Sequence, residues 1–71
     1  MKLEMKKVAV IGCGHWGKNL IRNFHELDSL AAVSDVNQDT AKEYSRTYDV
    51  PEMSLNDILD SDIDAIAIAA P

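Results

Sequence analysis

The sequence predicts an α/β fold built on a parallel sheet, and three observations lead to that prediction. Short runs of apolar, strand-forming residues alternate with segments of helical periodicity along the 71 residues. The first of these runs enters a glycine-rich turn that opens a helix. The last run, residues 64–70, is apolar on both faces after its first residue, as is typical of a strand buried in a parallel sheet. The predicted element order is β-α-β-α-β-α-β, and right-handed crossovers give the strand order 3-2-1-4.

The first strand, residues 8–11, leads into the pattern G-x-G-x-x-G formed by Gly12, Gly14 and Gly17. Strand, glycine turn and helix in this order are the context in which the pattern indicates a Rossmann-type dinucleotide site. Gly12 permits the tight turn, Gly14 lets the backbone approach a pyrophosphate, and Gly17 lets the helix lie close to the strand. The N-terminus of the helix would direct free N–H groups and a partial positive charge at the phosphates.

An acidic residue at the end of the second predicted strand, residues 30–34, supports this interpretation. Asp35 lies 23 positions after Gly12 and 18 after Gly17, close to the ~20 expected for a ribose-binding carboxylate. A carboxylate there accepts hydrogen bonds from the ribose hydroxyls and repels a 2′-phosphate, so the sequence favours NAD over NADP. The alternative is that Asp35 only begins a turn before the next helix.

The remaining elements follow in order and complete the predicted half of a doubly wound domain. Asn37 is placed to cap a helix over residues 38–48. Residues 50–53 are predicted as a brief edge strand, because the proline within them cannot donate to a central ladder. Ser54 is placed to cap a short helix over residues 55–60. The first two helices are expected on one face of the sheet, and only the short third helix on the other.

Three residues of the glycine turn have more than one interpretation. His15 could contact the pyrophosphate or point to solvent. Trp16 could stack on a ligand, but its place on the helical stripe favours packing in the core. Cys13 is expected to pack as a small residue beneath the turn rather than to perform redox chemistry. The histidines and the cysteine lack the spacing of a zinc site, and no metal is predicted.

Composition narrows the partners and the location of the chain. The net charge of −5, from 7 basic and 12 acidic residues, disfavours nucleic acid and anionic membranes, which would require a basic patch. No apolar run approaches the ~20 residues of a membrane span. The single cysteine cannot form an internal disulfide, and a cytoplasmic location is expected.

These motifs resemble the Gfo/Idh/MocA family of NAD(P)-dependent oxidoreductases, and the resemblance extends from Lys7 to Pro71. It is carried by Val-Ala-Val-Ile-Gly-Cys-Gly-His-Trp-Gly-Lys-Asn at 8–19, Ser-Asp-Val-Asn at 34–37 and Ala-Ala-Pro at 69–71. The Gly-His-Trp-Gly-Lys-Asn segment is most similar to members that act on nucleotide-linked sugars, such as UDP-N-acetylglucosamine 3-dehydrogenases.

The resemblance implies that cofactor contacts come from these three segments. The residues assigned to them are Gly12, Gly14, His15, Trp16, Gly17, Asp35, Asn37, Ala69 and Pro71. Members usually carry threonine where this chain has Ala70, in the segment that lines the nicotinamide side. The family's catalytic lysine belongs to a Glu-Lys-Pro motif that this sequence does not contain, so no catalytic residue is assigned.

The leading hypothesis is an NAD-binding half-domain, residues 1–71, of a sugar or sugar-nucleotide dehydrogenase, truncated before its catalytic and substrate-binding parts. One alternative is a self-associating structural fragment with a vestigial cofactor loop. Another is an S-adenosylmethionine-binding module, although the G-x-G-x-x-G spacing argues against it. A homodimer is expected, because residues 65–70 would form a strand whose outer edge carries no charge to oppose pairing. Packing through the sheet face that only the third helix covers is the other route to a dimer.

Overall fold

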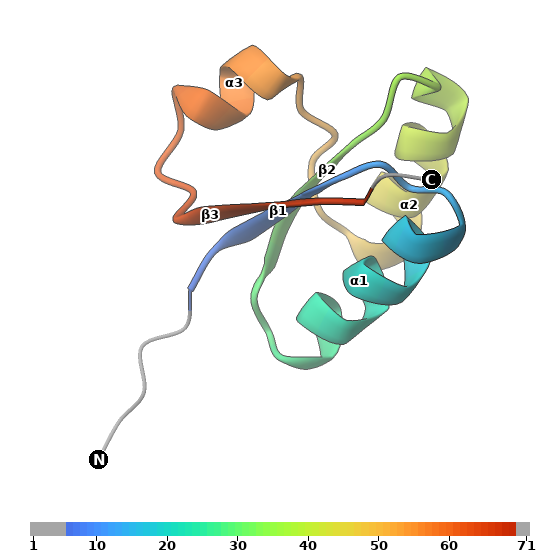
Figure 1. Cartoon of the computed structure of the whole chain (residues 1–71), viewed down its shortest axis with the longest axis horizontal. Helices are drawn as coiled ribbons and strands as arrows, with labels where there is room; N and C mark the ends of the chain where they lie inside the picture. The colour runs from blue at the N-terminus through green and yellow to red at the C-terminus, as the bar shows by residue number, and fades with distance from the viewer. Residues whose placement is uncertain (1–5, 70–71) are drawn as a thin grey trace.

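The computed structural model describes residues 6–69, apart from the side chain of His15, and these residues form an α/β structure (Figure 1). Its elements, in chain order, are β1 (Val8–Ile11), α1 (His15–Glu26), β2 (Leu30–Ser34), α2 (Gln38–Tyr48), α3 (Leu55–Leu59) and β3 (Ala65–Ile68). The α/β class and the parallel sheet predicted from the sequence are confirmed.

The sheet has three strands in the order β2-β1-β3, and β1 pairs in parallel with both neighbours. Ile11 at the end of β1 pairs with Ser34 of β2 and with Ile68 of β3. Because the register aligns these three residues, the carboxyl ends of the strands meet at one edge of the sheet. This is the edge at which ligands bind in open α/β sheets.

The predicted four-stranded order, 3-2-1-4, is not confirmed. Residues 50–53 form only an isolated parallel bridge, between Glu52 and Val33 of β2. The Val33 N–H group donates to the Pro51 carbonyl at 3.1 Å, and the Met53 N–H group donates back to the Val33 carbonyl at 3.0 Å. The segment therefore lies along the outer edge of β2, where the third strand was expected, but its pairing does not extend beyond one residue.

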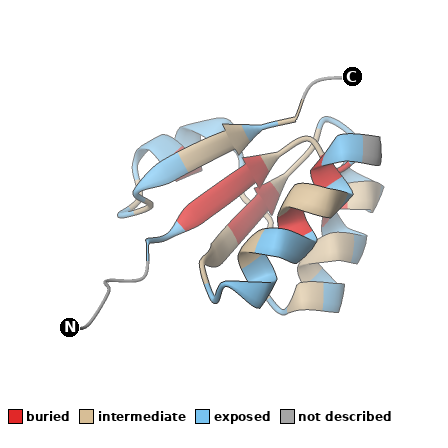
Figure 2. Ribbon diagram, turned by 60° about the horizontal axis from the view of Figure 1, so that its bottom comes forward, coloured by how far each residue is buried: buried red, intermediate tan, exposed pale blue. Residues whose placement is uncertain are grey.

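The helices are divided between the two faces of the sheet as predicted. On one face, β1 and β2 pack with α1 and α2 around a buried cluster made up of Val10, Cys13, Ile21 and Val33. On the other face, Ile58 of α3 packs on Ala9 and Ala32. Figure 2 shows that burial is concentrated in β1, β2 and the helix surfaces facing them.

Side-chain caps begin α2 and α3 at the predicted residues. Asn37 Oδ1 accepts the N–H group of Thr40 at 3.2 Å. Ser54 Oγ accepts the N–H group of Asp57 at 3.1 Å. Each cap satisfies one of the backbone donors that a helix leaves free at its first turn, which explains why polar residues mark these starts.

The prediction that the last strand is buried on both faces is wrong. β3 pairs with β1 on one side, and its ends are exposed, with 70% of Ile68 accessible to solvent. Residue 70, included in the predicted strand, lies outside the described residues. Within the described part of the chain, β3 is thus an edge strand whose apolar side chains are only partly covered.

Candidate functional site

The glycine turn lies at the carboxyl edge of the sheet, between the ends of β2 and β3. Gly12 has φ +96°, a conformation that side chains other than glycine rarely adopt. A Cβ atom on Gly12 would also lie close to the Ala69 carbonyl oxygen, which follows β3. The backbone holds this arrangement with two hydrogen bonds, from Gly12 N–H to the Ser34 carbonyl at 2.8 Å and from Ala69 N–H to the Ile11 carbonyl at 2.9 Å. Ala69 is therefore brought to the turn, as predicted.

The other two glycines differ in what surrounds them. A Cβ atom on Gly17 would overlap the carbonyl group of Gly12, so α1 can lie against the turn only with glycine at this position. Among the described residues, chain neighbours aside, a Cβ atom on Gly14 would meet no atom within 4 Å. Packing therefore explains Gly12 and Gly17, whereas the space beside Gly14 is open to a ligand.

The N-terminus of α1 begins directly at this open position. Gly14 is its N-cap residue, no side chain caps it, and its first turn contains no acidic residue. The first intrahelical bond runs from Lys18 N–H to the Gly14 carbonyl at 2.9 Å. The first turn of α1 therefore contains no carboxylate of its own to offset the positive end of the helix dipole, which suits an anionic group such as a pyrophosphate.

Asp35 follows β2 and connects two backbone segments. Its Oδ2 atom accepts the N–H group of Cys13 at 2.6 Å, and its Oδ1 atom accepts the N–H group of Asn37 at 2.8 Å. The second bond closes a turn before α2, which is the structural alternative considered from the sequence. A carboxylate has about four acceptor positions, so these two bonds leave capacity for ribose hydroxyls.

Cys13 is packed beneath the turn, as predicted. Only 2% of the residue is exposed, and its thiol contacts the Ser34 carbonyl, with 3.6 Å between sulfur and oxygen. Burial, with a smaller contribution from the Asp35 carboxylate, raises the pKa of the Cys13 thiol to about 11. The thiol is therefore protonated near neutral pH, which disfavours nucleophilic or redox chemistry.

The remaining residues that were predicted to contact the cofactor differ in where they lie. Trp16 is 63% exposed, so the prediction that it packs in the core is wrong, and it lies in the first turn of α1 beside the open position. Asn37 lies next to Asp35 but uses its side chain to cap α2. The side chain of His15 and residue Pro71 lie outside the described part of the structure.

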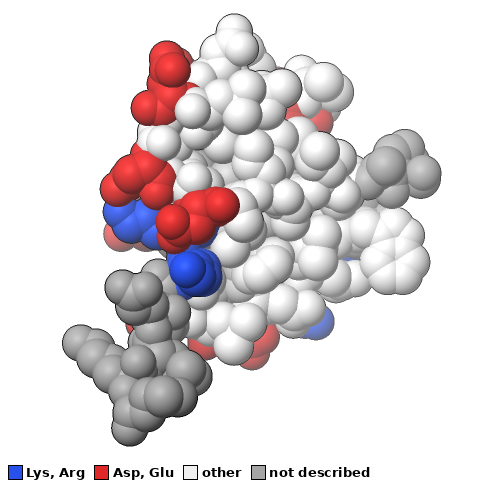
Figure 3. Space-filling model, turned by 60° about the vertical axis from the view of Figure 1, so that its left-hand side comes forward, with Lys and Arg blue, Asp and Glu red and all other residues white. Residues whose placement is uncertain are grey.

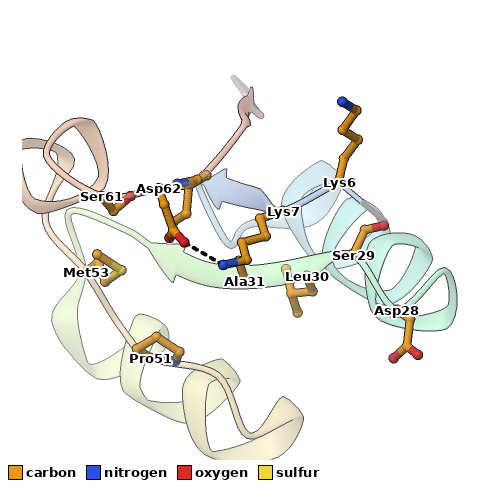
Figure 4. Close-up of a pocket in the computed structure, with 11 residues that line it drawn as sticks. Lys6, Lys7, Asp28, Ser29, Leu30, Ala31, Pro51, Met53, Ser61 and Asp62 are labelled. Carbon is orange, nitrogen blue, oxygen red and sulfur yellow. Dashed lines mark hydrogen bonds and ion pairs between the residues drawn. The ribbon is translucent and has the colours of Figure 1, made fainter. Parts of the chain in front are cut away.

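A cavity of about 510 Å³ lies at the opposite end of the sheet from the glycine turn (Figure 4). Residues at the amino ends of the strands line it, among them Lys7, Leu30 and Ile63. Lys7 Nζ and Asp62 Oδ2 form an ion pair at 2.6 Å across its rim. The cavity contains none of the predicted cofactor contacts and belongs to a different part of the molecule.

Residues 6–69 lack the features of two other kinds of site. No group of three or more His, Cys, Asp or Glu side chains is arranged to hold a metal ion within this range. No helix there is long and apolar enough to cross a bilayer.

A family model agrees with this geometry. Residues 6–71 match the Gfo/Idh/MocA model, described as an oxidoreductase family with an NAD-binding Rossmann fold. The chain belongs to this family, and the predicted cofactor, NAD, is the cofactor of the family.

Several proteins similar to this chain are dehydrogenases. Two L-tryptophan dehydrogenases, from Nostoc punctiforme and from its strain ATCC 29133 / PCC 73102, are 39% and 38% identical over 69 residues, which is 97% of this chain and 20% of each relative. Two structures of UDP-N-acetylglucosamine 3-dehydrogenase GnnA from Acidithiobacillus ferrooxidans superpose with TM-scores of 0.83 and 0.86 at 28% and 27% identity, covering 97% of this chain and 23% of theirs. The chain thus spans about a fifth of the length of these proteins.

Proposed function

We propose that this chain provides the NAD-binding part of a sugar or sugar-nucleotide dehydrogenase, with the cofactor held at the glycine turn. The observation that carries the proposal is the open space at Gly14, directly before the uncapped N-terminus of α1. Packing among residues 6–69 gives no reason for glycine there, whereas close approach of a pyrophosphate does.

The residues of the site would divide the cofactor between them. Gly14 and the first turn of α1 receive the pyrophosphate, and the free acceptor positions of Asp35 receive the adenosine ribose hydroxyls. The negative charge of Asp35 disfavours the 2′-phosphate of NADP. In this site, NAD would supply the hydride acceptor for oxidation of a substrate carbon.

The proposal also includes the other residues that were predicted to contact the cofactor. Trp16 and His15 lie at the variable positions of the turn, Asn37 follows Asp35, and Ala69 and Pro71 follow β3. The 71 residues contain no Glu-Lys-Pro motif, so their role is to bind the cofactor rather than to move a proton. We place the protein in the cytoplasm, where its single cysteine stays reduced.

A titration with NAD tests the binding site. We expect a dissociation constant on the order of 0.1–1 mM, equivalent to about −4 to −5.5 kcal/mol. Amide resonances of residues 12–17 and 34–37 should shift in NMR spectra, and S-adenosylmethionine should leave them in place. If these resonances do not respond to an NAD concentration several-fold above this dissociation constant in a folded sample, the assignment of the site is wrong.

Two substrate classes are supported by different relatives. The structural similarity to UDP-N-acetylglucosamine 3-dehydrogenase favours a nucleotide-linked sugar. The higher sequence identity to L-tryptophan dehydrogenases favours an L-amino acid as the second candidate. Reduction of NAD by UDP-N-acetylglucosamine or by L-tryptophan, followed at 340 nm with the full product of the gene, distinguishes them.

We also propose that two copies associate through the outer edge of β3. Ala65 and Ala69 donate their N–H groups towards β1, to Lys7 and Ile11, so by strand alternation the N–H groups of Ile66 and Ile68 point to the outer edge. The four residues of β3 include no charge or proline to oppose pairing. On the side of the molecule where α3 and β3 lie, charged side chains gather along one border of a broad uncharged area (Figure 3).

Two matched substitutions distinguish the two possible interfaces. Ile68→Lys places a charge on the exposed end of β3, and Leu59→Lys places one at the exposed end of α3, where 65% of the leucine is accessible. Light scattering should give twice the chain mass for the unmodified protein and for Leu59→Lys, and a smaller mass for Ile68→Lys. The reverse result indicates packing through the α3 face, and a folded monomer at high micromolar concentration refutes the dimer.

A further inference from the structure

The start of the glycine turn is attached to the end of β2 by three contacts. Gly12 N–H donates to the Ser34 carbonyl at 2.8 Å, and the Cys13 thiol contacts the same carbonyl. Cys13 N–H donates to Asp35 Oδ2 at 2.6 Å. Of these contacts, the short bond to Asp35 uses a charged side-chain acceptor, which makes it the strongest of the three by type.

This bond acts at the centre of the turn. Cys13 lies between Gly12 and Gly14, so fixing its peptide group also fixes the direction in which the chain enters α1. The second oxygen of Asp35 is held by Asn37 N–H at 2.8 Å, which fixes the carboxylate in turn. The carboxylate and the turn therefore form one hydrogen-bonded unit.

We propose that Asp35 is a positioning residue for the phosphate-binding turn, in addition to its proposed contact with ribose. The effect that this positioning role has on ligand binding rests on the proposed function. A carboxylate that contacted ribose alone would not matter for a ligand without ribose hydroxyls. Asp35 should matter for such a ligand, because it holds the peptide group between Gly12 and Cys13, within the turn.

Charge removal and loss of positioning predict opposite effects of Asp35→Asn on the binding of an anion. Removing a negative charge near a pyrophosphate should by itself strengthen binding of the anion. Loss of the turn's preorganised geometry should weaken it. Asp35→Asn and Asp39→Asn remove the same charge, but Asp39 is an exposed residue in the first turn of α2. Asp39→Asn is therefore the charge-matched control.

The first measurement needs no ligand. Asparagine retains one acceptor oxygen, so it cannot accept from both Cys13 and Asn37 on separate oxygens as the carboxylate does. We expect Asp35→Asn to increase amide hydrogen exchange at Cys13 by ~10-fold or more, the size associated with a hydrogen bond to a charged group. Exchange at Val10 and Val33 in the sheet should not change, which shows that the fold is intact. The Cys13 amide proton should also move upfield in Asp35→Asn and keep its position in Asp39→Asn.

The second measurement uses 2′,3′-dideoxyadenosine diphosphate, which has the phosphates but no ribose hydroxyls. We expect Asp35→Asn to weaken its binding several-fold relative to Asp39→Asn. Equal binding by the two variants, or unchanged exchange at Cys13 in Asp35→Asn, overturns the positioning role. If the unmodified chain binds neither NAD nor this diphosphate, the proposed function fails, and the exchange measurement still decides whether Asp35 holds the turn.

Discussion

Replacing Gly17 by alanine should destabilise the chain, although alanine is normally the better residue in a helix. In the interior of an exposed helix, Gly→Ala stabilises by about 1 kcal/mol. Here the new Cβ atom would lie 2.5 Å from the Gly12 carbonyl carbon, and backbone atoms cannot rotate away. Cβ atoms in proteins essentially never lie within 3.0 Å of such a neighbour, so α1 would have to move away from β1.

That displacement determines the size of the effect. Ile21 of α1 is fully buried, and Leu20 and Phe24 pack against the same cluster, so moving the helix loosens its main apolar contacts. Overpacking of this kind costs ~1–3 kcal/mol and sometimes more. Because the overlap is with backbone atoms, we place the cost of Gly17→Ala at the upper end of this range, ~3 kcal/mol. The helix preference of alanine offsets about 1 kcal/mol of it, which leaves a net loss of ~2 kcal/mol. In a domain of this size such a loss is a large fraction of the total stability.

Urea unfolding followed by circular dichroism measures this loss, with Gly14→Ala as the matched control. With a slope of about 1 kcal/mol per M, the midpoint of Gly17→Ala should fall by ~2 M, or cooperative unfolding should disappear. Gly14→Ala should stay near the unmodified midpoint, because its Cβ atom would meet no atom within 4 Å in the part of the chain that the structure describes. Equal midpoints for the two variants would refute the argument that Gly17 is required by packing.

Three further predictions test other parts of the structure. Asp35→Ala should weaken the binding of NAD and reduce the preference for NAD over NADP. An unchanged ratio of the two dissociation constants would mean that Asp35 only accepts hydrogen bonds from the backbone and does not contact the ribose. Stability should fall as pH rises from about 9 to 11, because the Cys13 thiol ionises near 9.0 when unfolded but has a pKa of about 11 when folded. Cys13→Ala should make this fall smaller, leaving the contribution of Tyr44, whose pKa is also raised by burial. Ser54→Ala should cost ~1 kcal/mol through loss of the cap on α3, and Ser29→Ala, outside any helix, should cost less in the same unfolding assay.

Local signals explain why much of the fold could be predicted from the sequence. The bounds of α2 coincide with the predicted residues because a cap and a helical stripe act within a few positions of one another. Val8–Ile11 and Leu30–Ser34 are similarly marked by short apolar runs that end in a glycine turn and an aspartate. These elements depend little on residues far away in the chain.

The errors concern residues whose environment depends on distant neighbours. Trp16 is one turn before Leu20 on the helical stripe, but α1 begins at the carboxyl edge of the sheet, so its first turn extends past the strands. The apolar sequence of β3 resembles a central strand, yet among residues 6–69 it pairs only with β1. Residues 50–53 lie at the expected edge, but pairing that depends on β2 alone reaches a single residue.

The Asp35–Cys13 hydrogen bond was not identified from the sequence, although both residues had been singled out. Spacing indicates that an acidic residue and a glycine turn serve one ligand, but it does not show that they bond to each other. The parallel pairing of Ile11 with Ser34 is what places Asp35 beside the turn. That contact follows from register, which a motif does not contain.

The three glycines consequently carry different information about function. Gly12 is explained by its positive φ and by Ala69, and Gly17 by the carbonyl of Gly12. A chain of this fold would need both even if it bound no cofactor, so their presence does not distinguish an active site from a vestigial loop. Gly14 offers a way to test the two alternatives, because nothing in the described chain occupies the space beside it. If the loop binds NAD, Gly14→Ala should weaken that binding while leaving the fold intact; if the loop is vestigial, neither property should change.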